Sequence, residues 1–208
     1  MAVTAAQLKR APTLPRSFYE RDPVTVSREV LGKVVVRESG GELLAGRIVE
    51  CEAYLGADDA AAHAASGRTE RNSVLFGPAG HAYVYFIYGV HYCLNFSCLP
   101  DGEAGGTLIR ALEPLAGIEH MQHARKLHDV KQLTNGPGKL AQAFHITRTD
   151  DNGKDVCSRR SDLRVVDDGF VVRPGEVVAT TRIGITKAAD LPLRFLLKNS
   201  AFVSRPAK

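Results

Sequence analysis

The segment RIVECEAYLG, residues 47–56, could place two glutamates and a tyrosine side by side. Because side chains alternate along a strand, a strand here would have one face formed by Ile48, Glu50, Glu52 and Tyr54. Its other face would be apolar and formed by Val49, Cys51, Ala53 and Leu55. Carboxylates are disfavoured in strands and costly to bury, so the pair indicates either a solvated outer face or acid–base chemistry beside an aromatic ring.

Polar and aromatic motifs continue downstream in a definite order. They are DDAAAH at 58–63, RTERN at 68–72, GHAYVYFIYG at 80–89, CLN at 93–95, RALEP at 110–114, GPGKL at 136–140 and RIG at 182–184. Together with EAYLG, these motifs resemble the alkyladenine DNA glycosylases, also called 3-methyladenine DNA glycosylases, a family that removes damaged purines from duplex DNA. The matches extend from about Val35 to Ser204, which is nearly the whole chain.

The resemblance implies three catalytic positions, which are Glu52, Arg110 and Ile183. Hydrolysis of an N-glycosidic bond passes through an oxocarbenium-like sugar, so Glu52 would orient a water as general base and offset the developing positive charge. Arg110 would hold the water and a flanking phosphate, and the Ile183 carbonyl would be a further water ligand. Glu50 is then a structural or electrostatic neighbour. No matched position supplies a Schiff-base lysine, which predicts a monofunctional enzyme that leaves an abasic site.

Recognition of the damaged base is also implied by the resemblance. A base must leave the helical stack before an enzyme can act on it, and Tyr88, at a predicted hairpin turn, would fill the gap that is left. Tyr54, His63 and Tyr85 would form a flat slot on which the purine stacks. Asn95 would crowd the 2-amino group of guanine and so help to reject this normal base.

Contacts with the DNA backbone are expected from basic residues, because phosphate contacts supply most sequence-independent affinity. The residues expected to make them are Arg68, Arg71, Lys139 and Arg182. Gly138 stands where many family members have a serine, so one polar contact is expected to be missing. The chain also diverges just after Gly184, where some members carry a histidine.

The four cysteines are not spaced like metal ligands. They lie at Cys51, Cys93, Cys98 and Cys157 and include no C-x-x-C pair, which argues against a zinc site. Cys51 and Cys93 are expected in the core, where a free cysteine behaves as a small hydrophobic residue. We expect no metal and no cofactor.

Length and composition limit the remaining possibilities. A chain of 208 residues with 44% hydrophobic content is long enough for one compact domain, so we expect an N-terminal tail at 1–16 and a single domain at 17–208. A net charge of +4 suits a polyanionic partner without requiring one. No run of 18 apolar residues is present, which predicts no membrane span. We expect an intracellular monomer, in the cytoplasm or nucleoid if bacterial.

The elements that would position these residues can be read from turn signals and periodicity. Asp22 can cap a helix that opens with Pro23, and further helices are expected at 114–126 and 139–145. Strands are expected at 33–37, 43–55, 83–86, 92–97, 107–112, 171–172, 176–186 and 194–203. Residues 56–80 form a long loop of the kind that often binds ligands. The pattern predicts an α+β single domain with a mostly antiparallel curved sheet, flanking helices and a protruding β-hairpin.

Three functions stay open at this point. The first is the repair glycosylase. The second is a protein that flips damaged bases without cutting, against which only Glu52 and Arg110 argue. The third is an unrelated sugar hydrolase with Glu50 and Glu52 as its carboxylate pair, since same-face neighbours on a strand lie roughly 6.5 to 7 Å apart. The third function leaves the tyrosines and the basic charge unexplained.

Overall fold

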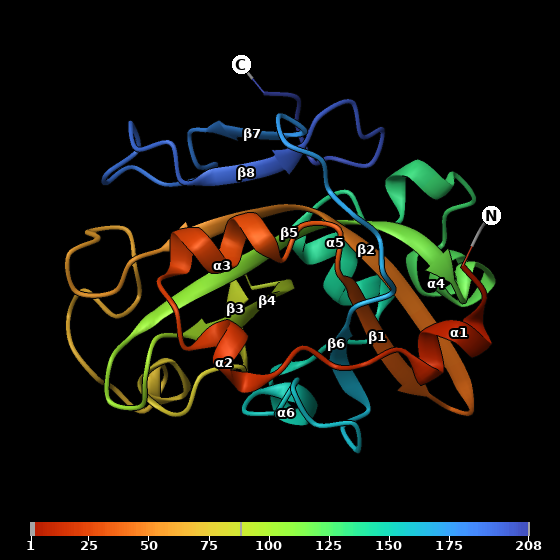
Figure 1. The fold of residues 1–208 in the computed structure, drawn as a ribbon, viewed down its shortest axis with the longest axis horizontal. Helices are drawn as coiled ribbons and strands as arrows, with labels where there is room; N and C mark the ends of the chain where they lie inside the picture. Colours follow the sequence, from red (N-terminus) through yellow and green to blue (C-terminus); the bar gives the residue numbers. More distant parts are fainter. Residues whose placement is uncertain (1–2, 88, 208) are drawn as a thin grey trace.

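Short helices occupy the N-terminal part of the computed structural model, which describes residues 3–87 and 89–207 (Figure 1). They are α1 (Ala5–Arg10), α2 (Arg16–Tyr19) and α3 (Pro23–Glu29). The Asp22 carboxylate accepts a hydrogen bond from a backbone N–H of the first turn of α3 (2.9 Å), and Pro23 stands in that turn. Helix α3 therefore begins as the sequence predicts, because its capping signal is local.

A curled antiparallel sheet forms the centre of the fold. In the described part of the chain its strands are β1 (Val34–Ser39), β2 (Glu42–Tyr54), β3 (Ala82–Ile87), β4 (His91–Cys98), β5 (Gly105–Ala116), β6 (Leu163–Val166), β7 (Val177–Thr180) and β8 (Arg194–Leu197). The strand order is β3-β4-β5-β2-β1-β6, and β8 pairs with both β2 and β7. The predicted α+β class and mostly antiparallel sheet are confirmed. The β3–β4 hairpin protrudes, with Phe86 45% and Val90 68% exposed.

Strands β2 and β5 do not alternate strictly between the two faces of the sheet. Their register shifts three times, so that Val49 on β2 and Arg110 and Leu115 on β5 are each an extra residue in the ladder. The residues that consequently enter the main core are Leu44, Ile48, Cys51 and Ala53 on β2 and Ile109 and Leu112 on β5. The prediction that Ile48 shares a face with the glutamates is therefore wrong, because strict alternation does not hold at Val49. Such bulges are common beside active sites, where they redirect side chains.

Several predicted elements have other bounds. Helix α4 (Ile118–Arg125) begins later than residue 114, because β5 continues to Ala116, which pairs with Ala45 of β2. Helix α5 (Pro137–Ala143) is close to its prediction, and α6 (Arg148–Asp151) and the 3-10 turns η1 (Ser73–Phe76) and η2 (Val130–Gln132) complete the set. No strand forms at 171–172. The strands expected at 176–186 and 194–203 shorten to β7 and β8, since the chain after β7 turns back to the end of β2.

The main hydrophobic core lies between the sheet and helices α3 and α5, which contribute Val26 and Leu140 respectively. Helix α1 packs in a smaller cluster through the buried Leu8. The division of the chain into a tail at 1–16 and a domain at 17–208 stays a prediction. Within the described residues, no helix has the length and apolar character needed to cross a membrane.

The loop after β2 is held in place by specific contacts. It starts at Gly56, whose φ of +90° is left-handed and where an added Cβ would lie 1.9 Å from the Ala104 carbonyl oxygen. Asn72 is buried and donates through its amide nitrogen to the carbonyls of His63 (2.9 Å) and Gly67 (3.0 Å). The sequence therefore uses a glycine to leave the strand and an asparagine to close the loop.

Candidate active site

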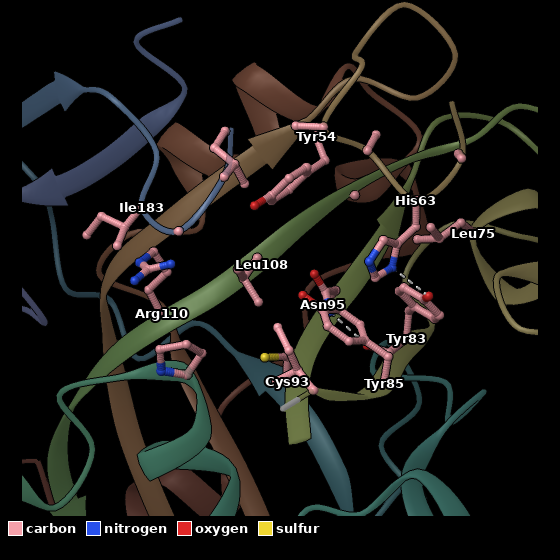
Figure 2. A pocket seen from close by; sticks show the side chains of 18 of the residues that line it. Tyr54, His63, Leu75, Tyr83, Tyr85, Cys93, Asn95, Leu108, Arg110 and Ile183 are labelled. Carbon is pink, nitrogen blue, oxygen red and sulfur yellow. Dashed lines mark hydrogen bonds between the residues drawn. The ribbon is translucent and has the colours of Figure 1, made fainter. Parts of the chain in front are cut away.

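A cavity of about 410 Å³ opens beside strands β2, β3, β4 and β5 (Figure 2). Its walls also include the loop after β2, the segment after β7 and the start of α5. The volume falls within the range of about 300–1,000 Å³ that is usual for small-molecule sites. The predicted site residues that line it are Tyr54, His63, Tyr85, Asn95, Arg110 and Ile183.

Glu52 is fully buried on β2, and its carboxylate contacts three residues of the cavity wall. Its Oε1 accepts a hydrogen bond from the Ile183 N–H (2.8 Å) and lies 3.1 Å from a guanidinium nitrogen of Arg110. Its Oε2 accepts from the Tyr54 hydroxyl (3.0 Å). Burial raises the pKa of Glu52, and these three partners oppose the rise. A carboxylate offers about four lone-pair positions, so a further hydrogen bond can still be accepted.

Arg110 joins the two glutamates. Its Nε donates to Glu50 (3.1 Å), and its Nη1 lies 3.1 Å from Glu52 Oε1. Burial alone would lower the pKa of Arg110, but the Glu52 and Glu50 carboxylates raise it above its ordinary value. Among the residues that the structure describes, Nη2 of Arg110 has no protein partner. That nitrogen is available to a molecule in the cavity.

Glu50 lies away from the cavity and is the centre of an ion-pair network. Its carboxylate is 0% exposed and accepts from Arg110, from Arg194 Nη1 (2.9 Å) and from the N–H (2.5 Å) and hydroxyl (2.7 Å) of Ser204. Two guanidinium groups and a serine therefore occupy both oxygens. This arrangement suits a residue that holds other groups in place.

Aromatic rings form two sides of the cavity. Figure 2 shows Tyr54 on one side and His63 with Tyr85 on the other. The centroids of the His63 and Tyr85 rings are 4.5 Å apart, and His63 Nδ1 is hydrogen-bonded to the Tyr83 hydroxyl (2.9 Å). Burial, together with the positive charge of Arg71, lowers the pKa of His63. This shift favours the uncharged form of the imidazole.

Arg182 lies behind Tyr54 and not on the outer surface. Its guanidinium carbon is 4.7 Å from the Tyr54 ring centroid, and its two terminal nitrogens donate to the Asp59 carboxylate (2.5 and 2.8 Å). Both charged side chains are 0% exposed. Burial opposes ionisation, but this ion pair raises the pKa of Arg182 and lowers that of Asp59. A guanidinium so enclosed has no exposed surface for a phosphate, and the observed contacts give Arg182 a positioning role for Tyr54.

The floor of the cavity comes from β4 and β5. Asn95 is buried and donates through its amide nitrogen to the Tyr83 carbonyl (3.1 Å), which fixes the orientation of the amide. Cys93, two residues before Asn95 on β4, and Leu108, the partner of Asn95 on β5, also line the cavity (Figure 2). Cys93 is buried, as expected, and also lines the cavity, whereas Cys51 belongs to the main core cluster as predicted.

The other residues predicted to contact DNA include three basic residues that are not part of the cavity wall. Arg68 and Arg71 are exposed on the loop after β2, and the Arg71 guanidinium is 6.0 Å from the centroid of the Tyr85 ring. Lys139 is half-buried on α5 and donates to the Asn135 side chain (2.8 Å). Tyr88 lies outside the described residues. The roles of these residues toward DNA stay predictions.

Sequence reasoning missed three residues at the site: Tyr83, Asp59 and Arg205. Tyr83 could have been found, because it stands two residues before Tyr85 on one face of the same strand. Asp59 and Arg205 are brought to the site by contacts between distant segments, which no local pattern predicts. Within residues 3–87 and 89–207, no three His, Cys, Asp or Glu side chains are grouped to hold a metal ion.

Comparison with known proteins gives one consistent group. A family model described as methylpurine-DNA glycosylase (MPG) matches residues 17–201. Three relatives carry the name "Putative 3-methyladenine DNA glycosylase". The relative from Koribacter versatilis is 61% identical over 201 residues, which cover 96% of each protein. Those from Methanoculleus marisnigri and Carboxydothermus hydrogenoformans are 51% and 46% identical, respectively. The matched regions cover 93% and 92% of this chain and 99% and 98% of the two relatives.

Proposed function

The chain belongs to the methylpurine-DNA glycosylase family, and we propose that it flips a damaged purine out of duplex DNA and hydrolyses its N-glycosidic bond by a water that Glu52 activates. Membership of the family makes it a DNA glycosylase, which is a hydrolase of N-glycosyl bonds. The observation that carries the proposal is the buried Glu52 carboxylate, which is held by three residues that line a base-sized aromatic cavity.

The proposed reaction starts with a water held between Glu52 and the Ile183 carbonyl. As the water oxygen bonds to C1′ of the sugar, a water proton passes to Glu52 and the electron pair of the breaking bond leaves with the base. The carboxylate also offsets the positive charge that develops on the sugar. The direct hydrogen bond between the Ile183 N–H and Glu52 supports this arrangement, because it keeps the two groups adjacent. The Nη2 of Arg110 reaches the cavity and binds the water or a flanking phosphate.

The damaged base stacks between Tyr54 and the pair formed by His63 and Tyr85. Because the pKa of His63 is lowered, its neutral ring can lie beside a cationic alkylated purine without charge repulsion. Such a cationic purine is already a good leaving group. Asn95, fixed by the Tyr83 carbonyl, crowds the 2-amino group of guanine. Tyr88, outside the described residues, fills the space that the base leaves in the duplex.

The geometry of the glutamates disfavours the two other functions. A sugar hydrolase would need Glu50 as the second reacting carboxylate, but two arginines and Ser204 occupy both oxygens of that group. A protein that flips bases without cutting would not need a carboxylate that is held by three residues of the cavity wall. The proposed partner is duplex DNA that contains a damaged purine. The protein binds it as a monomer, in the part of the cell that contains the DNA.

The proposal is tested by Glu52→Gln in single-turnover base release from duplexes that contain hypoxanthine, ethenoadenine or a methylated purine. The glutamine keeps the size of the side chain but cannot accept a proton from water, so we expect release to fall by about 10² to 10⁴-fold. Binding of the same duplexes should be retained. Glu42→Gln, an exposed change at the start of the same strand, is the control. Near-normal release by Glu52→Gln would falsify the assignment.

A further inference from the structure

The segment formed by residues 204–206 is fixed against the active site by the two residues of a buried ion pair. Glu50 accepts hydrogen bonds from the N–H (2.5 Å) and the hydroxyl (2.7 Å) of Ser204. Arg194, whose side chain is 4% exposed, donates to the carbonyls of Arg205 (3.0 Å) and Pro206 (3.3 Å). Every residue of the segment therefore has a backbone contact to the Glu50–Arg194 pair.

The same ion pair also reaches the catalytic side of the molecule. Glu50 accepts from Nε of Arg110, and Nε of Arg194 donates to the Thr181 carbonyl (3.0 Å), two residues before Ile183. The position of residues 204–206 is thus tied to the groups that surround Glu52. Arg205 is held at the cavity wall through its backbone, which leaves its side chain free to act.

Arg205 differs in its charge environment from the other arginine that lines the cavity. Arg110 is balanced by the Glu50 and Glu52 carboxylates. Arg205 is exposed, and in the described part of the chain no carboxylate lies within ion-pair distance of it. Because Arg110 is paired with carboxylates and Arg205 is not, the cavity has a net positive charge beside Arg205. That charge attracts an anion, and a guanidinium is well shaped to bind phosphate oxygens.

We propose that Arg205 binds a phosphodiester group of the DNA strand next to the flipped nucleotide. The inference rests on the proposed function, since it takes the strand that carries the damaged base to be the ligand. The Glu50–Arg194 pair holds the backbone of Arg205, so the backbone loses little conformational entropy on binding and only the side chain has to be ordered. Arg205 is a binding residue here and takes no part in the proton transfer.

The test measures binding of a duplex with a stable tetrahydrofuran abasic-site analogue, at a series of salt concentrations, for the wild type, Arg205→Gln, Arg205→Lys and Arg160→Gln. Loss of one phosphate contact should make the slope of log affinity against log salt shallower by about 0.9. Affinity at low salt should fall on the order of tenfold for Arg205→Gln. Arg205→Lys keeps the charge and should keep the slope. Arg160→Gln removes an exposed charge away from the cavity and should change neither quantity.

The outcomes separate this inference from the proposed function. Folding should be unaffected, because the contacts that hold Arg205 use its backbone carbonyl and not its side chain; thermal unfolding of each variant checks this. If Arg205→Gln retains the wild-type slope, or if Arg205→Lys loses as much as Arg205→Gln, the phosphate contact is overturned while base release can still be normal. If the wild type releases no base from any damaged duplex but the slope still depends on Arg205, the proposed function fails and the contact stands.

Discussion

At the residue scale, the Glu52 carboxylate is subject to opposing effects on its pKa. Burial raises the pKa, Arg110 and the Tyr54 hydroxyl lower it, and burial prevails. A general base must be ionised, so base release should fall as the pH drops through this raised pKa. The folded state also holds the Glu52 proton more tightly than the unfolded chain. The stability that this proton contributes is therefore lost as the pH rises through the raised pKa.

Tyr54→Phe should move the acid limb of the activity profile to higher pH. The change removes the hydroxyl that donates to Glu52 Oε2, and this hydrogen bond favours the ionised carboxylate. The measurement is single-turnover base release at saturating enzyme across the acid range. Tyr83→Phe is the matched control, because it removes a hydroxyl of the same cavity that bonds to His63 and not to Glu52. An acid limb that stays in place, or that moves to lower pH, would contradict the assigned hydrogen bond.

The types of the site residues could be predicted because the motifs keep their order and spacing, and six predicted residues do line one cavity. Their partners could not be predicted. Asp59 reaches Arg182 across a sequence separation of 123 residues, and no local pattern reports such a contact. Arg182 was taken as a DNA contact from its charge alone, whereas its burial depends on how the loop after β2 folds over Tyr54.

At the scale of elements, Glu50 joins four parts of the chain. It stands on β2 and binds Arg110 of β5, Arg194 of β8 and Ser204 after β8. A buried charge with two charged partners is costly to disrupt, since removing one member leaves the others unpaired in the interior. This carboxylate therefore fixes how β8 and the segment at 204–206 sit on β2.

Glu50→Gln should lower the free energy of unfolding by about 3 kcal/mol or more, because the buried Arg194 loses its carboxylate partner and Arg110 keeps only Glu52. Urea denaturation of this variant beside the wild type measures the change. Glu42→Gln, at the exposed beginning of the same strand, should stay within about 0.5 kcal/mol of the wild type. Equal stability of Glu50→Gln and the wild type would mean that the network does not hold these elements together. Base release per folded molecule should fall less than in Glu52→Gln, since Glu52 and its contacts stay in place.

The elements that the sequence predicts well are those with local signals. Asp22 and Pro23 mark the start of α3, and alternation marks the β3–β4 hairpin. The elements that it predicts poorly depend on distant partners. Strand β5 extends through residues 114–116 only because β2 runs beside it, and the expected strand at 171–172 finds no neighbour. The break in alternation at Val49 could not be predicted, because both faces of β2 are buried there. The sequence then shows no alternation between apolar and polar residues from which such a break could be recognised.

At the scale of the whole molecule, many basic side chains are neutralised internally. Buried or half-buried ion pairs occupy Arg37, Arg47, Arg110, Arg164, Arg182 and Arg194. The excess positive charge, which is +4 for the whole chain, is therefore carried by other basic side chains nearer the surface. These include Arg205, which lines the cavity, Arg71, which lies near the Tyr85 ring, Arg68 on the same loop as Arg71, and Lys139, which follows the cavity-lining Gly138. Their position agrees with a protein that meets a polyanion on the face where the cavity opens.

Affinity for undamaged duplex should fall linearly with salt on logarithmic axes. Four phosphate contacts give a slope of about −3.6, from about −0.9 per contact. Titrations of a labelled duplex between low and moderate salt measure it. Single-stranded DNA of the same length provides an internal comparison, since its slope should be shallower at about −0.7 per contact. A slope near zero for the duplex would exclude an electrostatic footprint of this kind.

The extra residues Val49 and Arg110 interrupt the alternation of side chains on β2 and β5, and this limits how the site could be transplanted into another protein. On an idealised pair of regular strands, the same sequence would turn Ile48 and Leu112 toward the glutamates and away from the core. A designer who grafted only the side chains of Glu50, Glu52 and Arg110 onto such a scaffold would therefore have to choose between a filled core and a working carboxylate. The part that would have to be transplanted as a whole is the irregular stretch of β2 and β5 that includes the extra residues Val49 and Arg110.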